Sequence, residues 1–257
     1  MGPATPGAPF VARLGGLVPA VDAALADLAA RDVVRRVWAR DHTLWRPDPA
    51  EVADRLGWLD CPATMPPHLP AVEALVDAVR AEGLTRVLLL GMGGSSLAPE
   101  VLRATFGVRA EHLDLAVLDS TDPAAVRAAG EQHPPAATLY VVATKSGGTV
   151  ETLSFFHHFH AEAVAAVGAA AAGRHFVAIT DPGSGLADLA ARHAFRATFL
   201  NDPGIGGRFS ALSLFGLVPA ALCGVDVRRL LERGRAAAVG AGGRFERGGD
   251  ADAGRRG

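Results

Sequence analysis

Residues 86–96 read RVLLLGMGGSS, an apolar run that leads directly into a turn of glycines and serines. Similar short runs recur along the chain, separated by helical segments. Runs that are apolar throughout, rather than at alternate positions, are typical of strands buried on both faces of a parallel sheet. The pattern therefore predicts a doubly wound, three-layer α/β domain with about five parallel strands over residues 84–226. The expected strands are 86–91, 113–119, 138–144, 175–180 and 195–200.

The segments on either side of this domain have a different character. Residues 1–83 are predicted to form an N-terminal helical segment, because apolar residues recur at helical spacing over 17–40 and a capping pattern at Asp48-Pro49 predicts a second helix. Beyond residue 227, arginine and glycine dominate and no sustained apolar period is visible. We therefore expect residues 227–257 to be a disordered or non-native tail.

The composition excludes several classes of protein. Charged residues make up 20% of the 257 residues and the net charge is −2, which argues against global disorder and against nucleic acid as the main partner. Two cysteines are too few for a disulfide framework or a four-cysteine zinc site. We expect no secretion signal, because the first residues lack a basic start and an apolar run, and the longest uncharged alanine-rich stretch, 163–173, is shorter than the ~20 residues that span a bilayer. We expect a cytoplasmic protein without membrane contact, metal or cofactor.

The turn after the first strand has the features of an anion site. Gly94 and the hydroxyls of Ser95 and Ser96 come just before a helix, whose unpaired N–H groups and dipole favour negative charge. A dinucleotide fingerprint, with Asp119 as the ribose ligand, is the alternative, although Ser96 occupies the place of its third glycine. A merely tight turn is the third possibility.

A second turn of the same kind follows the third strand. Residues 144–152 read TKSGGTVET and lead into another helix, and Lys145 is the only lysine in the chain. No G-x-x-x-x-G precedes Lys145-Ser146, so this is not a P-loop. Two such turns after neighbouring strands could place Ser95, Ser146 and Thr149 around one phosphate, which favours a phosphomonoester ligand. Capping of the helix by Ser146 and Thr149 is compatible with binding.

Two charged residues near these turns are candidates for chemistry. Glu151 lies in the first turn of the helix after Thr149, where it points toward the strand ends or is a surface carboxylate that favours the helix dipole. Arg208 follows Gly206-Gly207 in the loop after the fifth strand, where a guanidinium could meet negative charge on a ligand or intermediate.

Together, GMGGSSLAPE, TKSGGTVET and GGRFSALS resemble the phosphoglucose isomerase family and its sugar isomerase (SIS) domain, in the same order and spacing, over roughly residues 30–226. Residues 31–60, which precede these motifs, also resemble the isomerase half of fused transaldolase–isomerase proteins. The resemblance implies interconversion of glucose 6-phosphate and fructose 6-phosphate in glycolysis and gluconeogenesis. It implies phosphate and sugar binding by Ser95, Thr144, Ser146 and Thr149, a pocket shaped by Gly94 and Lys145, enediolate stabilisation by Arg208 after Gly207, and a sugar site lined by Glu151.

One departure from the family limits the expected activity. The family's carboxylate base, ring-opening histidine and late lysine come from a second half that has no counterpart in this sequence, so the chain resembles a truncated or frame-shifted N-terminal part. We expect weak phosphosugar binding and little catalysis by the chain alone, and a homodimer is possible. A phosphosugar-binding SIS module without catalysis is the main alternative, and a nicotinamide-dependent enzyme is the weaker one.

Overall fold

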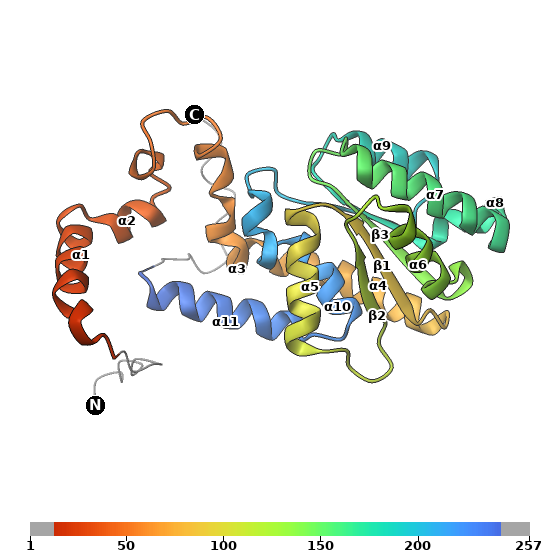
Figure 1. Ribbon diagram of the computed structural model, residues 1–257, viewed down its shortest axis with the longest axis horizontal. Helices are drawn as coiled ribbons and strands as arrows, with labels where there is room; N and C mark the ends of the chain where they lie inside the picture. The colour runs from red at the N-terminus through yellow and green to blue at the C-terminus, as the bar shows by residue number, and fades with distance from the viewer. Residues whose placement is uncertain (1–12, 243–257) are drawn as a thin grey trace.

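The computed structural model describes residues 13–242 and contains a five-stranded, fully parallel sheet (Figure 1). The strand order is β2-β1-β3-β4-β5, which confirms the predicted doubly wound α/β fold. β1 and β3 are neighbours, and Gly91 at the end of β1 pairs with Ala143 at the end of β3. The turns that follow these two strands therefore start side by side. The strands are β1 Arg86–Gly91, β2 Asp114–Leu118, β3 Thr138–Ala143, β4 Phe176–Thr180 and β5 Ala197–Leu200.

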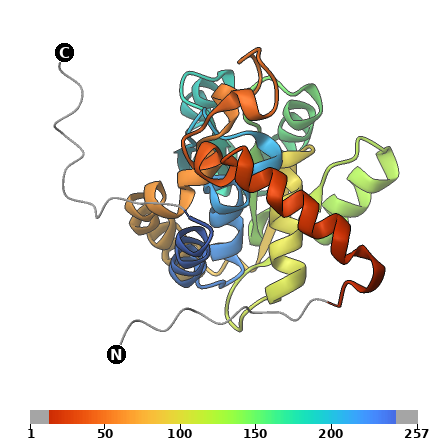
Figure 2. The same ribbon diagram turned by 90° about the vertical axis from the view of Figure 1, so that its left-hand side faces the viewer.

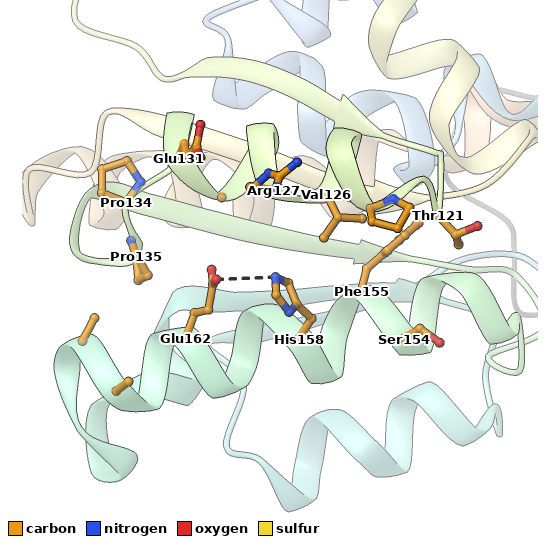
Figure 3. Close-up of a pocket in the computed structure, with 14 residues that line it drawn as sticks. Thr121, Val126, Arg127, Glu131, Pro134, Pro135, Ser154, Phe155, His158 and Glu162 are labelled. Atoms are coloured by element: carbon orange, nitrogen blue, oxygen red, sulfur yellow. Dashed lines mark ion pairs between the residues drawn. The ribbon is translucent and has the colours of Figure 1, made fainter.

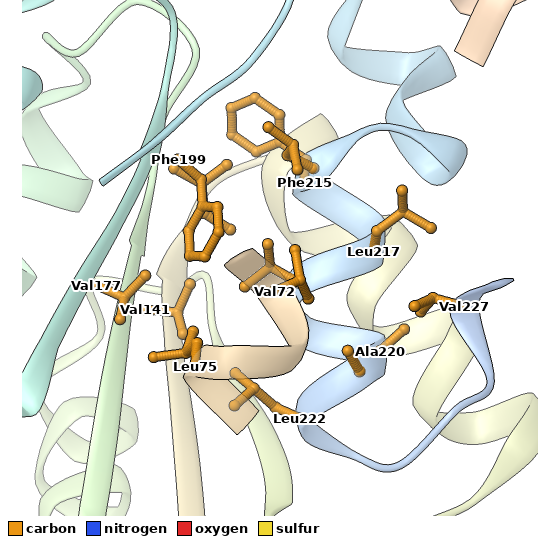
Figure 4. Packing of buried hydrophobic residues seen from close by; sticks show 14 of the residues in the cluster. Val72, Leu75, Val141, Val177, Phe199, Phe215, Leu217, Ala220, Leu222 and Val227 are labelled. Atoms are coloured by element: carbon orange, nitrogen blue, oxygen red, sulfur yellow. The ribbon is translucent and has the colours of Figure 1, made fainter. Parts of the chain in front are cut away.

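Two layers of helices cover the sheet because its strands are apolar on both faces. Leu89, Val141 and Val177 face one apolar cluster, where side chains of α4 and α10 pack on the strands (Figure 4). Leu88 and Tyr140 face a second cluster on the other side, with phenylalanines of α7. The first layer consists of α4 Leu69–Ala81, α5 Gly94–Phe106 and α10 Leu214–Leu222, and the second of α6 Pro123–Gln132, α7 Val150–Val167 and α9 Gly185–Arg192.

Shorter or more peripheral elements complete the described chain. The α-helices are α1 Val18–Ala30, α2 Val33–Trp38, α3 Cys61–Thr64, α8 Ala169–Ala172 and α11 Val227–Gly240. The 3-10 helices are Gly15–Leu17, His42–Leu44, Ala53–Arg55, Gly57–Asp60, Pro66–His68, Pro135–Ala137, Gly173–His175 and Gly207–Leu212. Within residues 13–242, no helix is both long enough and apolar enough to span a membrane.

The N-terminal segment is only partly helical. Asp32 has a left-handed backbone (φ 52°) and separates α1 from α2. The two helices extend from one end of the molecule (Figure 1), and Figure 2 shows that end facing the viewer. The prediction of a helix that begins at Asp48 is wrong. Its residues pair with a distant loop instead: Leu56 forms an antiparallel bridge with Ile205, and the Gly57 N–H donates to Gly204 O at 2.8 Å.

The prediction that the chain becomes irregular at residue 227 is also wrong for the described part, up to residue 242. Asp226 caps α11 by accepting from the Arg229 N–H, and Val227 and Leu231 are buried against the first core cluster. The sequence pattern that predicts this helix is short, because its three apolar residues at helical spacing, Val227, Leu230 and Leu231, all lie at the start of α11. Residues 243–257 of the predicted tail lie outside the described residues.

One buried histidine predicts how stability depends on pH. The His133 side chain is buried, its Nδ1–H donates to Ala129 O at 2.8 Å, and burial lowers its pKa below the ordinary 6.5. Because the folded pKa lies below the unfolded one, the unfolded chain binds protons more readily, so stability is complete above pH 6.5 and declines as the pH falls through that value. We expect His133→Gln to reduce the slope of unfolding free energy against pH between 5 and 7.

Urea unfolding at a series of pH values measures this slope. His160 also has a lowered pKa, again mainly from burial, so part of the slope should remain in the variant. The same substitution at the exposed His68 provides a matched control. An unaltered slope in His133→Gln would show that protonation of His133 does not cause the loss of stability at low pH.

Candidate functional site

The turns after β1 and β3 meet at one cavity of about 710 Å³. All seven residues predicted to bind substrate line it: Gly94, Ser95, Thr144, Lys145, Ser146, Thr149 and Gly207. The residues of the two turns converge because β1 and β3 are parallel neighbours, so their carboxyl ends open at the same edge of the sheet. Gly207 reaches the cavity on the loop after β5. The hypothesis that both turns bind one and the same phosphate depends on this adjacency of β1 and β3.

The turn after β3 is held by its own hydroxyls. Thr144 Oγ1 and Thr149 Oγ1 lie 2.8 Å apart, and the Gly148 N–H donates to Ser146 Oγ at 3.3 Å. Gly147 has φ 71°, and a Cβ there would lie 2.7 Å from the Cβ of Ser184, so both conformation and space require glycine. The result is a compact turn that presents hydroxyls and the N-terminus of α7 to the cavity.

The turn after β1 is held against the loop after β5 by direct backbone contact. A Cβ on Gly94 would lie 2.4 Å from both the carbonyl carbon and the oxygen of Gly207. The Ser210 hydroxyl lies 3.1 Å from Gly94 O and 2.7 Å from Gly207 O, and it donates to these carbonyls. Since no side chain intervenes, the distance between the two loops is set by their backbones.

Lys145 is one of two cations in the cavity wall, the other being Arg55. Lys145 Nζ donates to Asp181 Oδ2 and to Pro203 O, the latter at 2.7 Å. The side chains are 25% and 16% exposed, so the pair is partly shielded from water. The other oxygen of Asp181 is buried and has no hydrogen-bond partner among the described residues. An ammonium in this position can attract an anion that enters the cavity.

The two residues predicted to be catalytic lie outside this cavity. Arg208 lines an adjoining hollow of about 540 Å³ that shares Gly94 and Gly207 with it. The neighbouring Phe209 stacks on Trp58, with ring centroids 5.4 Å apart. Glu151 is half-buried in the first turn of α7 and is not among the residues that line either hollow. The structure therefore places Arg208 next to the cavity between the two turns and does not bring Glu151 into it.

Several residues of the cavity were missed by sequence reasoning. They are Asp54, Arg55, Met92, Asp181, Pro203 and Gly204. Asp181 directly follows β4, so the rule that ligands bind at the carboxyl ends of strands could have found it. Arg55 carries no such signal, because it reaches the cavity through the bridge between Leu56 and Ile205.

A larger hollow, of about 970 Å³, lies between α6 and α7 (Figure 3), away from the two turns. His158 Nε2 pairs with Glu162 Oε1 there at 3.4 Å. Residues 13–242 contain no group of three or more histidine, cysteine or acidic side chains that could hold a metal ion. Burial also raises the pKa of Cys223 to about 11, which argues against a reactive thiolate.

The fold and the paired turns together define the class of the protein, a doubly wound α/β domain with a cavity at the carboxyl edge of its parallel sheet. The phosphoglucose isomerase family model matches residues 76–239, and the chain belongs to that family. This membership favours the phosphate interpretation of the first turn over the dinucleotide one.

Individual relatives agree with this assignment. The chain is 39% identical over 149 residues to a glucose-6-phosphate isomerase of Thermosynechococcus vestitus, covering 57% of this chain and 28% of the relative. It is 31% identical over 243 residues to that of Trichormus variabilis, covering 84% and 42%. A solved structure of a hypothetical protein from Thermus thermophilus has a TM-score of 0.74 at 31% identity, covering 87% of this chain and 51% of that one. The chain thus spans less than half the length of the two named isomerases.

Proposed function

We propose that the cavity between the two turns binds the phosphate of glucose 6-phosphate and fructose 6-phosphate, and that the chain takes part in their interconversion. The observation that carries this proposal is the convergence of seven predicted residues from three separate loops on one cavity. Family membership supports the substrate class, since relatives covering up to 84% of this chain are named glucose-6-phosphate isomerases.

The cavity offers several kinds of donor to a phosphate. The hydroxyls of Ser95, Ser146 and Thr149 and the helix N-termini after both turns can donate to its oxygens, and the ammonium of Lys145 adds a charged N–H donor while it stays paired with Asp181. A hexose 6-phosphate anchored in this way can extend its sugar carbons toward the edge of the cavity. The hollow that holds Arg208 adjoins it through Gly94 and Gly207, and is the proposed place of the reacting carbons.

The proposed chemistry moves one proton between neighbouring carbons of the open-chain sugar. A base removes the C–H proton next to the carbonyl, and the electron pair forms an enediolate. The proton then returns to the former carbonyl carbon, while the hydroxyl proton moves from the oxygen of the new carbonyl to the oxygen of the former one. Negative charge develops on oxygen meanwhile, and we assign its stabilisation to the guanidinium of Arg208. The role of Glu151 in lining the sugar site, the pathway, the cytoplasmic location and the homodimer stay predictions.

We do not assign the base to the phosphate cavity. Its two lining carboxylates, Asp54 and Asp181, are both engaged in ion pairs, with Arg55 and Lys145 respectively. We propose that the base comes from the part of the isomerase relatives that this chain does not span. Under this proposal the purified chain binds hexose phosphate but turns it over poorly, and the function approaches that of a phosphosugar-binding module.

Calorimetric titration of fructose 6-phosphate into the purified chain tests the binding proposal. Replacing Ser95 and Ser146 together by alanine should weaken affinity about 100-fold or more, since hydrogen bonds to a charged group contribute about 1.5–3 kcal/mol each. Ser154→Ala is the matched control, because this exposed hydroxyl on α7 donates only to its own helix, at Val150 O. No heat from a folded sample, or equal heat from the double variant, would refute the site.

A coupled assay of glucose 6-phosphate formation separates the two functional alternatives. Binding without turnover is expected. Turnover at a rate typical of enzymes, about 1–10³ s⁻¹, would instead place a base within this chain.

A further inference from the structure

We infer that Arg55, from the N-terminal segment, is a second cation for the phosphosugar, and that it exchanges two carboxylate partners for the ligand's phosphate. This inference deepens the proposed function and rests on it for the identity of the ligand. Arg55 lines the phosphate cavity but belongs to none of the three motifs that carry the family resemblance.

The backbone around Arg55 is fastened to the loop that closes the cavity. Arg55 O accepts from the Gly206 N–H at 3.4 Å, and the next residue, Leu56, forms the bridge to Ile205. A Cβ on Gly57 would lie 2.8 Å from Gly204 O, so the two strands of chain approach as closely as their backbones allow. The backbone of Arg55 is therefore fixed at the cavity.

The present partners of the guanidinium are weak ones. Nη2 donates to both carboxylate oxygens of Glu51, at 3.1 and 3.0 Å, and Nη1 donates to Asp54 Oδ2 at 2.9 Å. The Glu51 and Asp54 side chains are 74% and 60% exposed, and pairs with such exposed carboxylates contribute little because water competes for both charges. A phosphate dianion in a partly enclosed cavity offers the guanidinium a stronger, bidentate partner.

The charge balance of the cavity points to the same exchange. Its lining holds two cations, Lys145 and Arg55, and two carboxylates, Asp181 and Asp54. Lys145 is bound to Asp181, which is more buried than the two carboxylates that pair with Arg55, so Lys145 keeps its partner when the ligand enters. A dianion therefore gains a free positive charge only if Arg55 leaves Glu51 and Asp54.

Three variants test the exchange by calorimetric titration with fructose 6-phosphate. Arg55→Gln should weaken affinity about tenfold or more, through loss of a charge-assisted hydrogen bond. Glu51→Gln should strengthen affinity, up to about fivefold, because it removes a competitor for Arg55 without touching the cavity. Arg46→Gln, which removes an exposed arginine from the same segment, should leave affinity unchanged.

The outcomes are distinguishable from failure of the proposed function. If the unaltered chain binds no fructose 6-phosphate, both proposals fail. If it binds, but Arg55→Gln binds equally well, only the inference on Arg55 fails. Weaker binding by Glu51→Gln would mean that the ion pairs merely hold the segment in place, and would also overturn the inference. Arg55→Lys keeps a positive charge, so partial retention of affinity separates loss of charge from misfolding.

Discussion

Replacing Gly94 by alanine is expected to abolish detectable binding of fructose 6-phosphate and to lower the free energy of unfolding by about 1–3 kcal/mol or more. The new methyl group would lie 2.4 Å from the carbonyl carbon and oxygen of Gly207, and neither backbone can yield without moving its whole loop. The turn after β1 and the loop after β5 would have to separate, which opens the phosphate cavity. Urea unfolding and calorimetric titration measure the two losses.

The reciprocal substitution provides a matched control for stability. A Cβ on Gly207 would meet only the Gly94 Cα, at 3.9 Å, which is an ordinary contact. Gly207→Ala should therefore change the free energy of unfolding by less than about 0.5 kcal/mol, as a typical surface substitution does. Equal destabilisation by the two substitutions would show that the backbone contact between the loops is not the cause.

Replacing Lys145 by methionine is expected to weaken fructose 6-phosphate binding by about 100-fold or more. One charged hydrogen bond to the phosphate contributes about 1.5–3 kcal/mol, and its loss alone accounts for a factor of about 10 to 100. The substitution also leaves the Asp181 carboxylate without its cation in the cavity wall, where it repels the dianion. Loss of attraction and gain of repulsion act in the same direction.

A double variant separates these two contributions. Asp181→Asn in the Lys145→Met background removes the unpaired negative charge while keeping the side-chain shape, so it should recover part of the lost affinity. Titration of both variants with fructose 6-phosphate gives the comparison. Identical affinities would show that Asp181 does not repel the ligand, and undiminished binding by Lys145→Met would remove the lysine from the site.

The fold and most of the cavity could be predicted because their signals are local. β1 runs from Arg86 to Gly91, as its apolar run predicts, and the other strands differ from prediction by at most two residues at either end. Once the strands are parallel and β1 neighbours β3, the turns at their carboxyl ends must meet. The convergence of Ser95, Ser146 and Thr149 therefore follows from topology alone.

The wrong predictions arise where distant contacts override a local pattern. Asp48-Pro49 has the residues of a helix start, but the chain beyond it pairs Leu56 with Ile205 and forms no α-helix before residue 61. In α11, the arginines and glycines suggest disorder, yet the Asp226 cap and the burial of Val227 and Leu231 stabilise the helix. Arg55 enters the cavity through the same distant pairing, so no periodicity in the sequence marks it.

The stacking of Trp58 on Phe209 has a practical consequence for observing the molecule at work. An indole in contact with the residue next to Arg208 changes its surroundings whenever that loop moves. Of the two other tryptophans, Trp45 is half exposed and Trp38 lies at the far end of α2, where its Nε1–H donates to Ala241 O. Ultraviolet emission from the unlabelled chain therefore contains an intrinsic optical signal from the loop proposed to meet the reacting sugar.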